Sequence, residues 1–187
     1  MIEFLKNIDT RLFLFFNGSH TEFMDSVMAA VTNKFIWIPL YLVLLFFVWR
    51  KIKSKMWLVV LSVAVLVTLS DQLSVHLFKE TFERYRPCHN ILIKDKVHLL
   101  NGHCGGMYGF VSSHAANTFA LTTFLILLFR RKDFALCMYL WAAFVSYSRV
   151  YAGVHYPFDI LGGMILGIIL GLIGYKFYFN LNKKNPG

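Results

Sequence analysis

Residues 148–159 read SRVYAGVHYPFD and lie between two long apolar runs. Pro157 lacks a backbone N–H and fits best in the first turn of a helix, so a helix is predicted to begin there and to continue into the second apolar run. His155 then lies just outside the start of this helix. Asp159 lies in its first turn, from which a carboxylate can reach an imidazole nitrogen. Arg149 adds a planar donor group that can bind phosphate oxygens. We therefore predict that residues 148–159 contain the main catalytic residues.

The composition indicates a membrane protein. Of the 187 residues, 57% are hydrophobic, and the mean hydropathy of +0.56 is too high for an ordinary soluble domain. The net charge of +9 could suggest a nucleic-acid partner, but the cations gather in short links between apolar runs. That distribution is typical of cytoplasmic loops next to anionic lipids. We therefore expect one membrane-embedded domain over residues 1–187, with membrane lipids and no nucleic acid as partners.

Apolar runs long enough to span a bilayer, alone or with a few neighbouring residues, predict the fold class. They cover residues 35–49, 56–78, 114–129, 134–147 and 157–175. Residues 2–16 mix apolar and charged side chains in a pattern that favours a helix lying in the membrane interface. The predicted fold is all-α, a polytopic membrane helix bundle with about five transmembrane helices and an N-terminal interfacial helix.

Several residues inside the predicted spans give expectations about packing. A stripe of small residues at every fourth position should let a neighbouring helix approach closely; it consists of Gly163, Gly167 and Gly171. Asp71 and His76 are expected to face protein rather than lipid, as buried polar support outside the catalytic set. Cys137 is expected to be a small buried apolar residue.

Basic links predict the orientation of the chain in the membrane. Short loops rich in Lys and Arg stay in the cytoplasm, which places residues 50–55, residues 130–133 and the C-terminal end on that side. The connections at 79–113 and 148–157 then share the outer face, although the first of them also carries five cations: Lys79, Arg84, Arg86, Lys94 and Lys96. We expect a multi-pass protein of the inner membrane whose active site faces the periplasm.

Polar clusters at helix ends on this outer face predict a phosphate site. They are Lys79 with Arg86-Pro87, then Ser112-Ser113-His114, then Ser148-Arg149 with His155 and Asp159. Three cations suit one polyanionic group, and two histidines offer the nucleophile and the proton donor that phosphoester cleavage needs. Arg84 lies outside the strict spacing, and for this residue contact with phosphate and contact with a lipid headgroup both stay open.

The spacing of these clusters resembles the three motifs of the type 2 phosphatidic acid phosphatase superfamily, in its bacterial membrane-bound branch. The resemblance implies a membrane phosphatase with no cofactor and no metal, in which His155 attacks phosphorus and becomes phosphohistidine. It further implies that Asp159 supports the nucleophile and that His114 protonates the leaving oxygen. The implied phosphate-binding residues are Lys79, Arg86, Ser112, Ser113 and Arg149. This chain has Ser113 where the family pattern has glycine, so the backbone there lacks a glycine's freedom.

The outer connection also carries Cys88 and Cys104, together with three histidines. A zinc site is one interpretation, although the spacing matches no standard ligand pattern. A disulfide is the other, and an oxidising periplasm would favour it; closing this loop would contribute roughly 3 kcal/mol.

The expected reaction is hydrolysis of a phosphomonoester or diphosphate on an amphiphile. The candidate substrates are undecaprenyl diphosphate, phosphatidylglycerophosphate, phosphatidic acid and lipid A phosphate, and the sequence does not rank them. The alternative is a non-catalytic lipid or anion transporter with a cationic cleft. Such a transporter needs polar residues along a route across the bilayer, and few are present beyond Asp71, Gln72 and His76.

Overall fold

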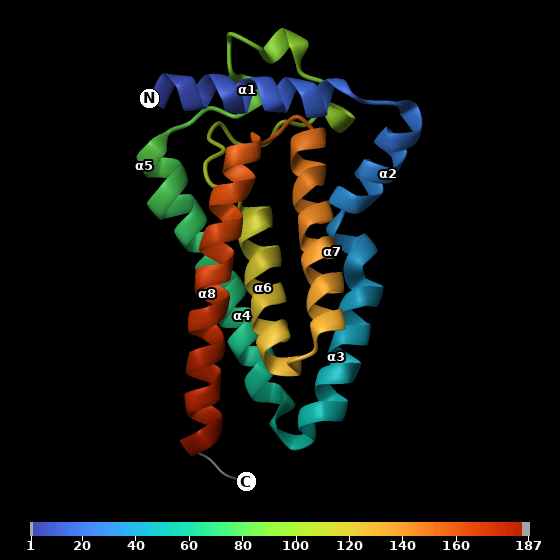
Figure 1. Cartoon of the computed structure of the whole chain (residues 1–187), viewed down its shortest axis with the longest axis vertical. Helices are drawn as coiled ribbons and strands as arrows, with labels where there is room; N and C mark the ends of the chain where they lie inside the picture. The colour runs from blue at the N-terminus through green and yellow to red at the C-terminus, as the bar shows by residue number, and fades with distance from the viewer. Residues whose placement is uncertain (1, 185–187) are drawn as a thin grey trace.

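The computed structural model describes residues 2–184, which form a bundle of long helices with one helix lying across its end. Helix α1 (Ile2–Gly18) crosses the top of the bundle in Figure 1, and α2 (Glu22–Thr32) descends from it. The long helices are α3 (Ile38–Ile52), α4 (Met56–Gln72), α6 (Ser113–Phe129), α7 (Lys132–Tyr151) and α8 (Pro157–Lys184). The predicted all-α bundle is confirmed.

The helix predicted over residues 56–78 extends further than expected. Beyond α4 the chain continues through a π-helical segment, Leu73–Lys79, and the single turn α5 (Glu80–Phe82). Lys79 therefore lies inside a helix rather than at the start of the polar connection. Two stretches, Lys34–Phe82 and Pro157–Lys183, are long and apolar enough to cross a membrane, and Ser113–Phe129 is a shorter apolar helix. The first stretch reverses direction between α3 and α4, so it holds two antiparallel helices (Figure 1).

The glycine stripe of α8 lies against α6, as predicted. A Cβ atom on Gly163 would lie 2.5 Å from the carbonyl oxygen of Ser112, and one on Gly167 would lie 2.4 Å from that of Ala116. Real side chains do not approach a backbone so closely, so only glycine lets the two helices meet here. One result is a direct bond between the starts of the helices, because the Ser112 N–H donates to the Asp159 carbonyl oxygen over 3.0 Å.

The expectations for His76 and Cys137 are wrong. The His76 side chain is 63% exposed, and its ring nitrogens lie 3.1 Å from side-chain oxygens of Gln72 and Glu80. These partners stand one turn away on the same helix, so the ring needs no contact from another helix. Cys137 is exposed, because α7 turns its neighbour Met138 toward the core instead.

Helix α1 is held to the bundle by a narrow buried face. Asp9, Phe13 and Asn17 are fully buried, whereas Phe4 and Phe15 are more than 60% exposed. The amide of Asn17 donates to the carbonyl oxygens of His98 and Tyr151, each over 2.8 Å. Because these partners belong to the outer connection and to the last turn of α7, α1 is fastened to the same end of the bundle as residues 148–159.

The basic links lie at the opposite end from α1. The turn between α3 and α4 and the turn between α6 and α7 are at the bottom of Figure 1, as is the C-terminal end of α8. The cations of these turns include Arg50, Lys51, Lys53, Arg130 and Arg131. The bundle therefore has one strongly basic end and one end that collects the polar clusters.

Candidate active site

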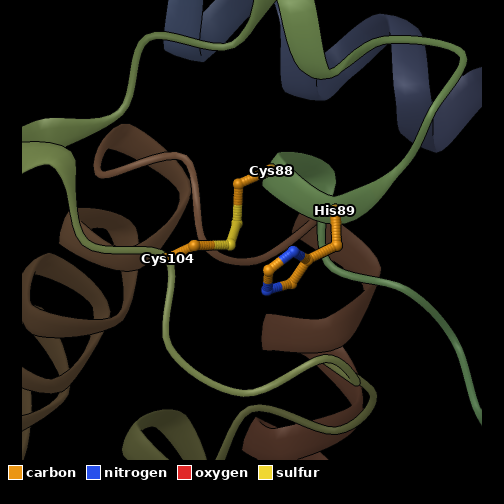
Figure 2. A group of neighbouring side chains, drawn as sticks. All are labelled: Cys88, His89 and Cys104. Atoms are coloured by element: carbon orange, nitrogen blue, oxygen red, sulfur yellow. A yellow bond between two sulfur atoms is a disulfide. The ribbon is translucent and has the colours of Figure 1, made fainter.

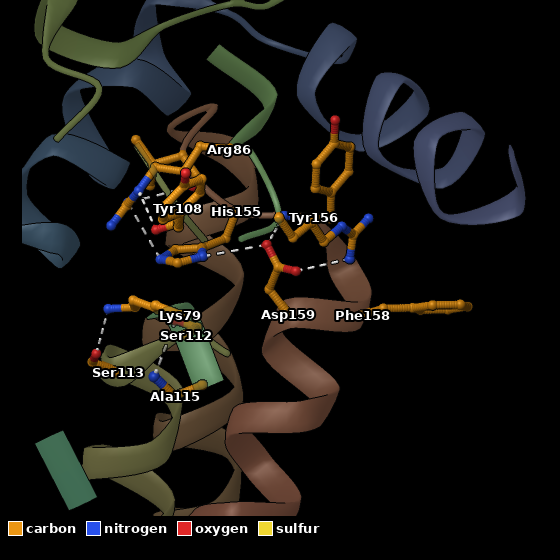
Figure 3. A network of polar contacts seen from close by, with 12 residues as sticks. Lys79, Arg86, Tyr108, Ser112, Ser113, Ala115, His155, Tyr156, Phe158 and Asp159 are labelled. Carbon is orange, nitrogen blue, oxygen red and sulfur yellow. Dashed lines mark hydrogen bonds and ion pairs between the residues drawn. The ribbon is translucent and has the colours of Figure 1, made fainter. Parts of the chain in front are cut away.

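The fold brings the three polar clusters together beneath α1. Lys79 ends the π-helical segment, Ser112 is the N-cap of α6, and Asp159 lies in the first turn of α8. Figure 3 shows side chains from all three clusters around one small region, with the His155 ring beside Arg86 and Asp159. Residues separated by about 80 positions in the chain thus form one site.

His155 lies in the short loop between α7 and α8 and is only 2% exposed. The loop turns at Gly153, whose φ of +78° favours glycine and where a Cβ would lie 2.6 Å from the His98 carbonyl oxygen. The N–H groups of Val154 and His155 both donate to the Arg149 carbonyl oxygen over 3.2 Å. The backbone of this loop is therefore fixed before any substrate binds.

The two nitrogens of the His155 ring face opposite charges. Nδ1 lies 3.4 Å from Oδ2 of Asp159, and Nε2 lies 3.4 Å from a guanidinium nitrogen of Arg86. Burial, together with the charges of Arg86, Arg149 and Lys79, lowers the pKa of His155 well below its usual value. The ring is therefore neutral at pH 7, which is the form that can act as a nucleophile.

Asp159 is fully buried, and both of its carboxylate oxygens are engaged. Oδ2 accepts the N–H of Tyr156 over 3.0 Å, and Oδ1 accepts from Arg84 over 2.8 Å. Arg84, for which the sequence left two roles open, thus contacts a carboxylate of the site. A carboxylate held at two points keeps one orientation, which is what a partner for His155 requires.

Arg86 contacts His155, and all three predicted phosphate-binding cations interact electrostatically with its ring. Arg86 is fixed by the carbonyl oxygens of Tyr108 at 3.2 Å and Val154 at 3.4 Å. Arg149 donates from Nη1 to the Thr32 hydroxyl, while its buried Nε has no acceptor among residues 2–184. Lys79 donates to the Ser113 hydroxyl over 2.7 Å. Each cation keeps donor hydrogens that a phosphate oxygen could accept.

The start of α6 supplies the remaining predicted residues. Ser112 is fully buried and caps the helix, with its Oγ 3.5 Å from the Ala115 N–H. Ser113 is the first helical residue and has no positive φ, so a glycine's freedom is not needed there. His114 is exposed and interacts electrostatically with His155 and with the three cations. Its ring therefore belongs to the same group as the candidate nucleophile.

Sequence reasoning missed Asp9, which it treated as one charge of an interfacial helix. Asp9 is fully buried, and its Oδ2 accepts from Arg84 over 2.7 Å while its Oδ1 accepts the Phe158 N–H over 2.9 Å. Burial raises the pKa of the Asp9 carboxyl, and the bond to Arg84 opposes that shift. The available signal was the four-residue spacing of Asp9, Phe13 and Asn17, which puts two polar groups and a ring on one helix face.

Cys88 and Cys104 form a disulfide, with their Cα atoms 6.0 Å apart (Figure 2). His89 lies beside the bond, and its Nε2 is 3.2 Å from the Gly105 carbonyl oxygen. Both sulfurs are used in the disulfide, so they present no thiolate to a metal. In this state the disulfide interpretation of the cysteine pair holds, and the zinc interpretation does not.

Comparison with known proteins finds a family and individual relatives that align with most of the chain. The model of the PAP2 superfamily matches residues 57–183. A lipid A 4'-phosphatase of Bacteroides thetaiotaomicron is 43% identical over 185 residues, which cover 98% of this chain and 81% of the relative. A lipid A 4'-phosphatase of Porphyromonas gingivalis is 35% identical over 184 residues, with coverage of 98% and 78%. The crystal structure of Aquifex aeolicus LpxE matches with a TM-score of 0.66 and 26% identity, covering 89% of this chain and 94% of LpxE.

The chain therefore belongs to the PAP2 superfamily, and the family resemblance of its three motifs is confirmed. It is a membrane-embedded lipid phosphate phosphatase of this superfamily, in which a histidine nucleophile is typical. The transporter alternative is set aside on the same grounds.

Proposed function

We propose that this phosphatase removes a phosphate from lipid A through a phosphohistidine intermediate on His155. The observation that carries the chemistry is the orientation of the His155 ring, with Nδ1 toward Asp159 and Nε2 toward Arg86. A neutral imidazole that presents Nε2 to a guanidinium, with a carboxylate at Nδ1, is arranged to attack the phosphorus of a phosphate bound by that cation. The choice of lipid A is supported by the two relatives of that name, which align over 98% of the chain.

In the first half of the proposed reaction, Nε2 of His155 forms a bond to phosphorus and the bond from phosphorus to the sugar oxygen breaks. The positive charge that develops on the imidazole is stabilised by Asp159 at Nδ1. Lys79, Arg86 and Arg149 hold the three non-bridging oxygens, whose charge they neutralise as the transition state forms. His114 gives its proton to the leaving sugar oxygen.

In the second half, a water molecule attacks the phosphorus of the phosphohistidine. His114, now neutral, accepts a proton from this water, and the bond from phosphorus to Nε2 breaks. Inorganic phosphate leaves, and His155 returns to its neutral form. The same two histidines thus serve both steps, and the proton balance closes over one cycle.

The lipid part of the substrate would need an apolar surface next to the site. A groove of about 710 Å³ lies under α1, where its walls include Leu5, Phe82, Phe110 and Phe158. Arg84 and Asp9 also line it, so the groove adjoins residues that contact Asp159. We propose that this face lies at the periplasmic surface of the inner membrane, since the basic turns at the other end suit the cytoplasm.

The proposal is tested with purified protein and a panel of four lipids: lipid A, undecaprenyl diphosphate, phosphatidylglycerophosphate and phosphatidic acid. Phosphate release measures kcat/KM for each, and mass spectrometry of the lipid A product shows whether the 4'-phosphate is lost. We expect kcat/KM to be highest for lipid A and His155→Ala to abolish turnover of all four. A clearly higher kcat/KM for undecaprenyl diphosphate would contradict lipid A as the substrate, while the proposed phosphohistidine mechanism would still hold.

A further inference from the structure

We propose that Asp9 and Arg84 are positioning residues of the active site, through which helix α1 orients the Asp159 carboxylate toward His155. Helix α1 is then part of the catalytic unit and not a membrane anchor alone. This inference rests on the proposed roles of His155 and Asp159, and it adds two residues that the three sequence motifs do not contain.

A continuous chain of polar contacts leads from α1 to the candidate nucleophile. Asp9 accepts from Nη2 of Arg84 over 2.7 Å, and Nη1 of the same guanidinium donates to Asp159 over 2.8 Å. Asp159 in turn lies 3.4 Å from His155 (Figure 3). The two carboxylates that Arg84 joins, Asp9 and Asp159, come from helices at opposite ends of the sequence.

The guanidinium is shaped for this bridge. A guanidinium is planar, and its two terminal nitrogens point in fixed, different directions, so one Arg84 can donate to both carboxylates. A lysine ammonium has a single nitrogen and cannot reproduce this geometry. The ring of Tyr156 lies 4.1 Å from the guanidinium carbon and holds its plane. Both carboxylates are fully buried, so removing the bridge would deprive each of its arginine ion-pair partner.

Asp9 also reaches the helix that carries Asp159 by a second route. Its Oδ1 accepts the Phe158 N–H, which belongs to the first turn of α8. The first N–H groups of a helix have no partner inside the helix, so Asp9 acts as a cap supplied from another element. One carboxylate on α1 thus fixes both the start of α8 and the guanidinium that orients Asp159.

The test compares Asp9→Ala and Arg84→Lys with Asp25→Ala as the matched control. Asp25 also joins an N-terminal helix to the bundle, through the Tyr151 hydroxyl at 2.5 Å and the His98 ring at 2.9 Å. Among residues 2–184, Asp25 forms no hydrogen bond or ion pair with Asp159. For each variant, kcat, KM and inhibition by vanadate are measured, together with the rate and amplitude of phosphoenzyme formation in a single turnover.

We expect Asp9→Ala and Arg84→Lys to lower kcat and the rate of phosphoenzyme formation by about 10- to 100-fold, because misplacing a catalytic group has costs of this order. KM, vanadate inhibition and the burst amplitude should stay within a few-fold of wild type. Asp9→Asn keeps one acceptor for the Phe158 N–H and should fall between. Asp25→Ala should change kcat by less than about threefold. In an Asp159→Asn background, Asp9→Ala should have little further effect, since residues that act through one another are not additive.

Three results would overturn the inference while leaving the proposed function in place. A lower burst amplitude with an unchanged rate would mean that α1 only keeps the protein folded. Weaker vanadate inhibition in proportion to the loss of kcat would make Arg84 a phosphate ligand. If the effects of Asp9→Ala and Asp159→Asn on kcat were fully additive, Asp9 would not act through Asp159. A wild-type protein that forms no phosphoenzyme would overturn the proposed function itself, and the inference with it.

Discussion

Nδ1 of His155 lies 3.4 Å from Oδ2 of Asp159, on the side of the ring away from Arg86. The ring therefore has one nitrogen beside a carboxylate and one nitrogen beside a guanidinium. His114 lies in the first turn of α6, is exposed, and forms no hydrogen bond with this carboxylate among residues 2–184. Two histidines in one site thus have different surroundings, and this difference leads to separate predictions for their variants.

The first prediction concerns the leaving group. A lipid alkoxide leaves poorly, so His155→Ala and His114→Ala should each lower kcat strongly, and loss of the acid alone is worth roughly 10²–10⁴-fold. A phenolate leaves without a proton, so His114→Ala should still form labelled phosphoenzyme from an aryl phosphate, whereas His155→Ala should form none. Rapid single-turnover labelling measures both. Label on the His155→Ala protein would show that the nucleophile is assigned to the wrong residue.

A second prediction follows from the lowered pKa of His155. An imidazole attacks only when neutral, so activity is lost as pH falls through the pKa of the folded enzyme. Because that pKa lies below the usual value of about 6.5, the acidic limb of kcat/KM should lie below pH 6.5. The profile is measured with an aryl phosphate whose own ionisation is titrated separately by phosphorus NMR. An acidic limb above pH 7 that belongs to the enzyme would contradict the buried, cation-flanked environment.

A third prediction concerns the contact between α6 and α8. A methyl group at Gly167 would lie 2.4 Å from the Ala116 carbonyl oxygen, so Gly167→Ala should push the helices apart. We expect a loss of about 1–3 kcal/mol in unfolding free energy and lower activity. Gly174→Ala is the control on the same helix, since its Cβ would meet only the Leu66 side chain at 3.2 Å. Equal effects of the two substitutions would show that the close approach is not needed.

The proposed orientation is tested by cysteine labelling in intact cells, in a Cys137→Ser background. A cysteine at Lys94, in the outer connection, should react with an impermeant maleimide, whereas a cysteine at Lys53, in the basic turn, should react only after the cells are lysed. The opposite pattern would place the active site in the cytoplasm.

The last prediction concerns the disulfide between Cys88 and Cys104. Its loop spans 16 residues, so replacing both cysteines with serine should lower the unfolding free energy by roughly 3 kcal/mol. Non-reducing mass spectrometry of protein from membranes should find the linked peptide. Cys137→Ser is the control and should leave stability unchanged within about 0.5 kcal/mol. Two free thiols at Cys88 and Cys104 in the membrane-extracted protein would contradict the bond.

The amino-acid sequence was enough to predict the membrane class, the helical runs and the residues that could bind a phosphate. Long apolar runs admit one structure in a bilayer, because every backbone polar group must be satisfied within its own segment. The spacing of the glycine stripe predicted a close helix contact for a similar reason, since it depends on one helix face only. Pro157 likewise marked the start of α8 from local chemistry alone.

The surroundings of each charged side chain depend on how the helices pack, and the sequence did not predict them. Arg84 lies two residues from Arg86, yet it contacts Asp9 and Asp159 while Arg86 faces His155. His76 is exposed, although its position in an apolar run predicted burial. The contacts and the exposure of these side chains depend on which distant segments of the chain pack together, for example α1 against the start of α8. Periodicity along one helix carries no information on that partner, so the contacts that hold the Asp159 carboxylate form only when the helices pack.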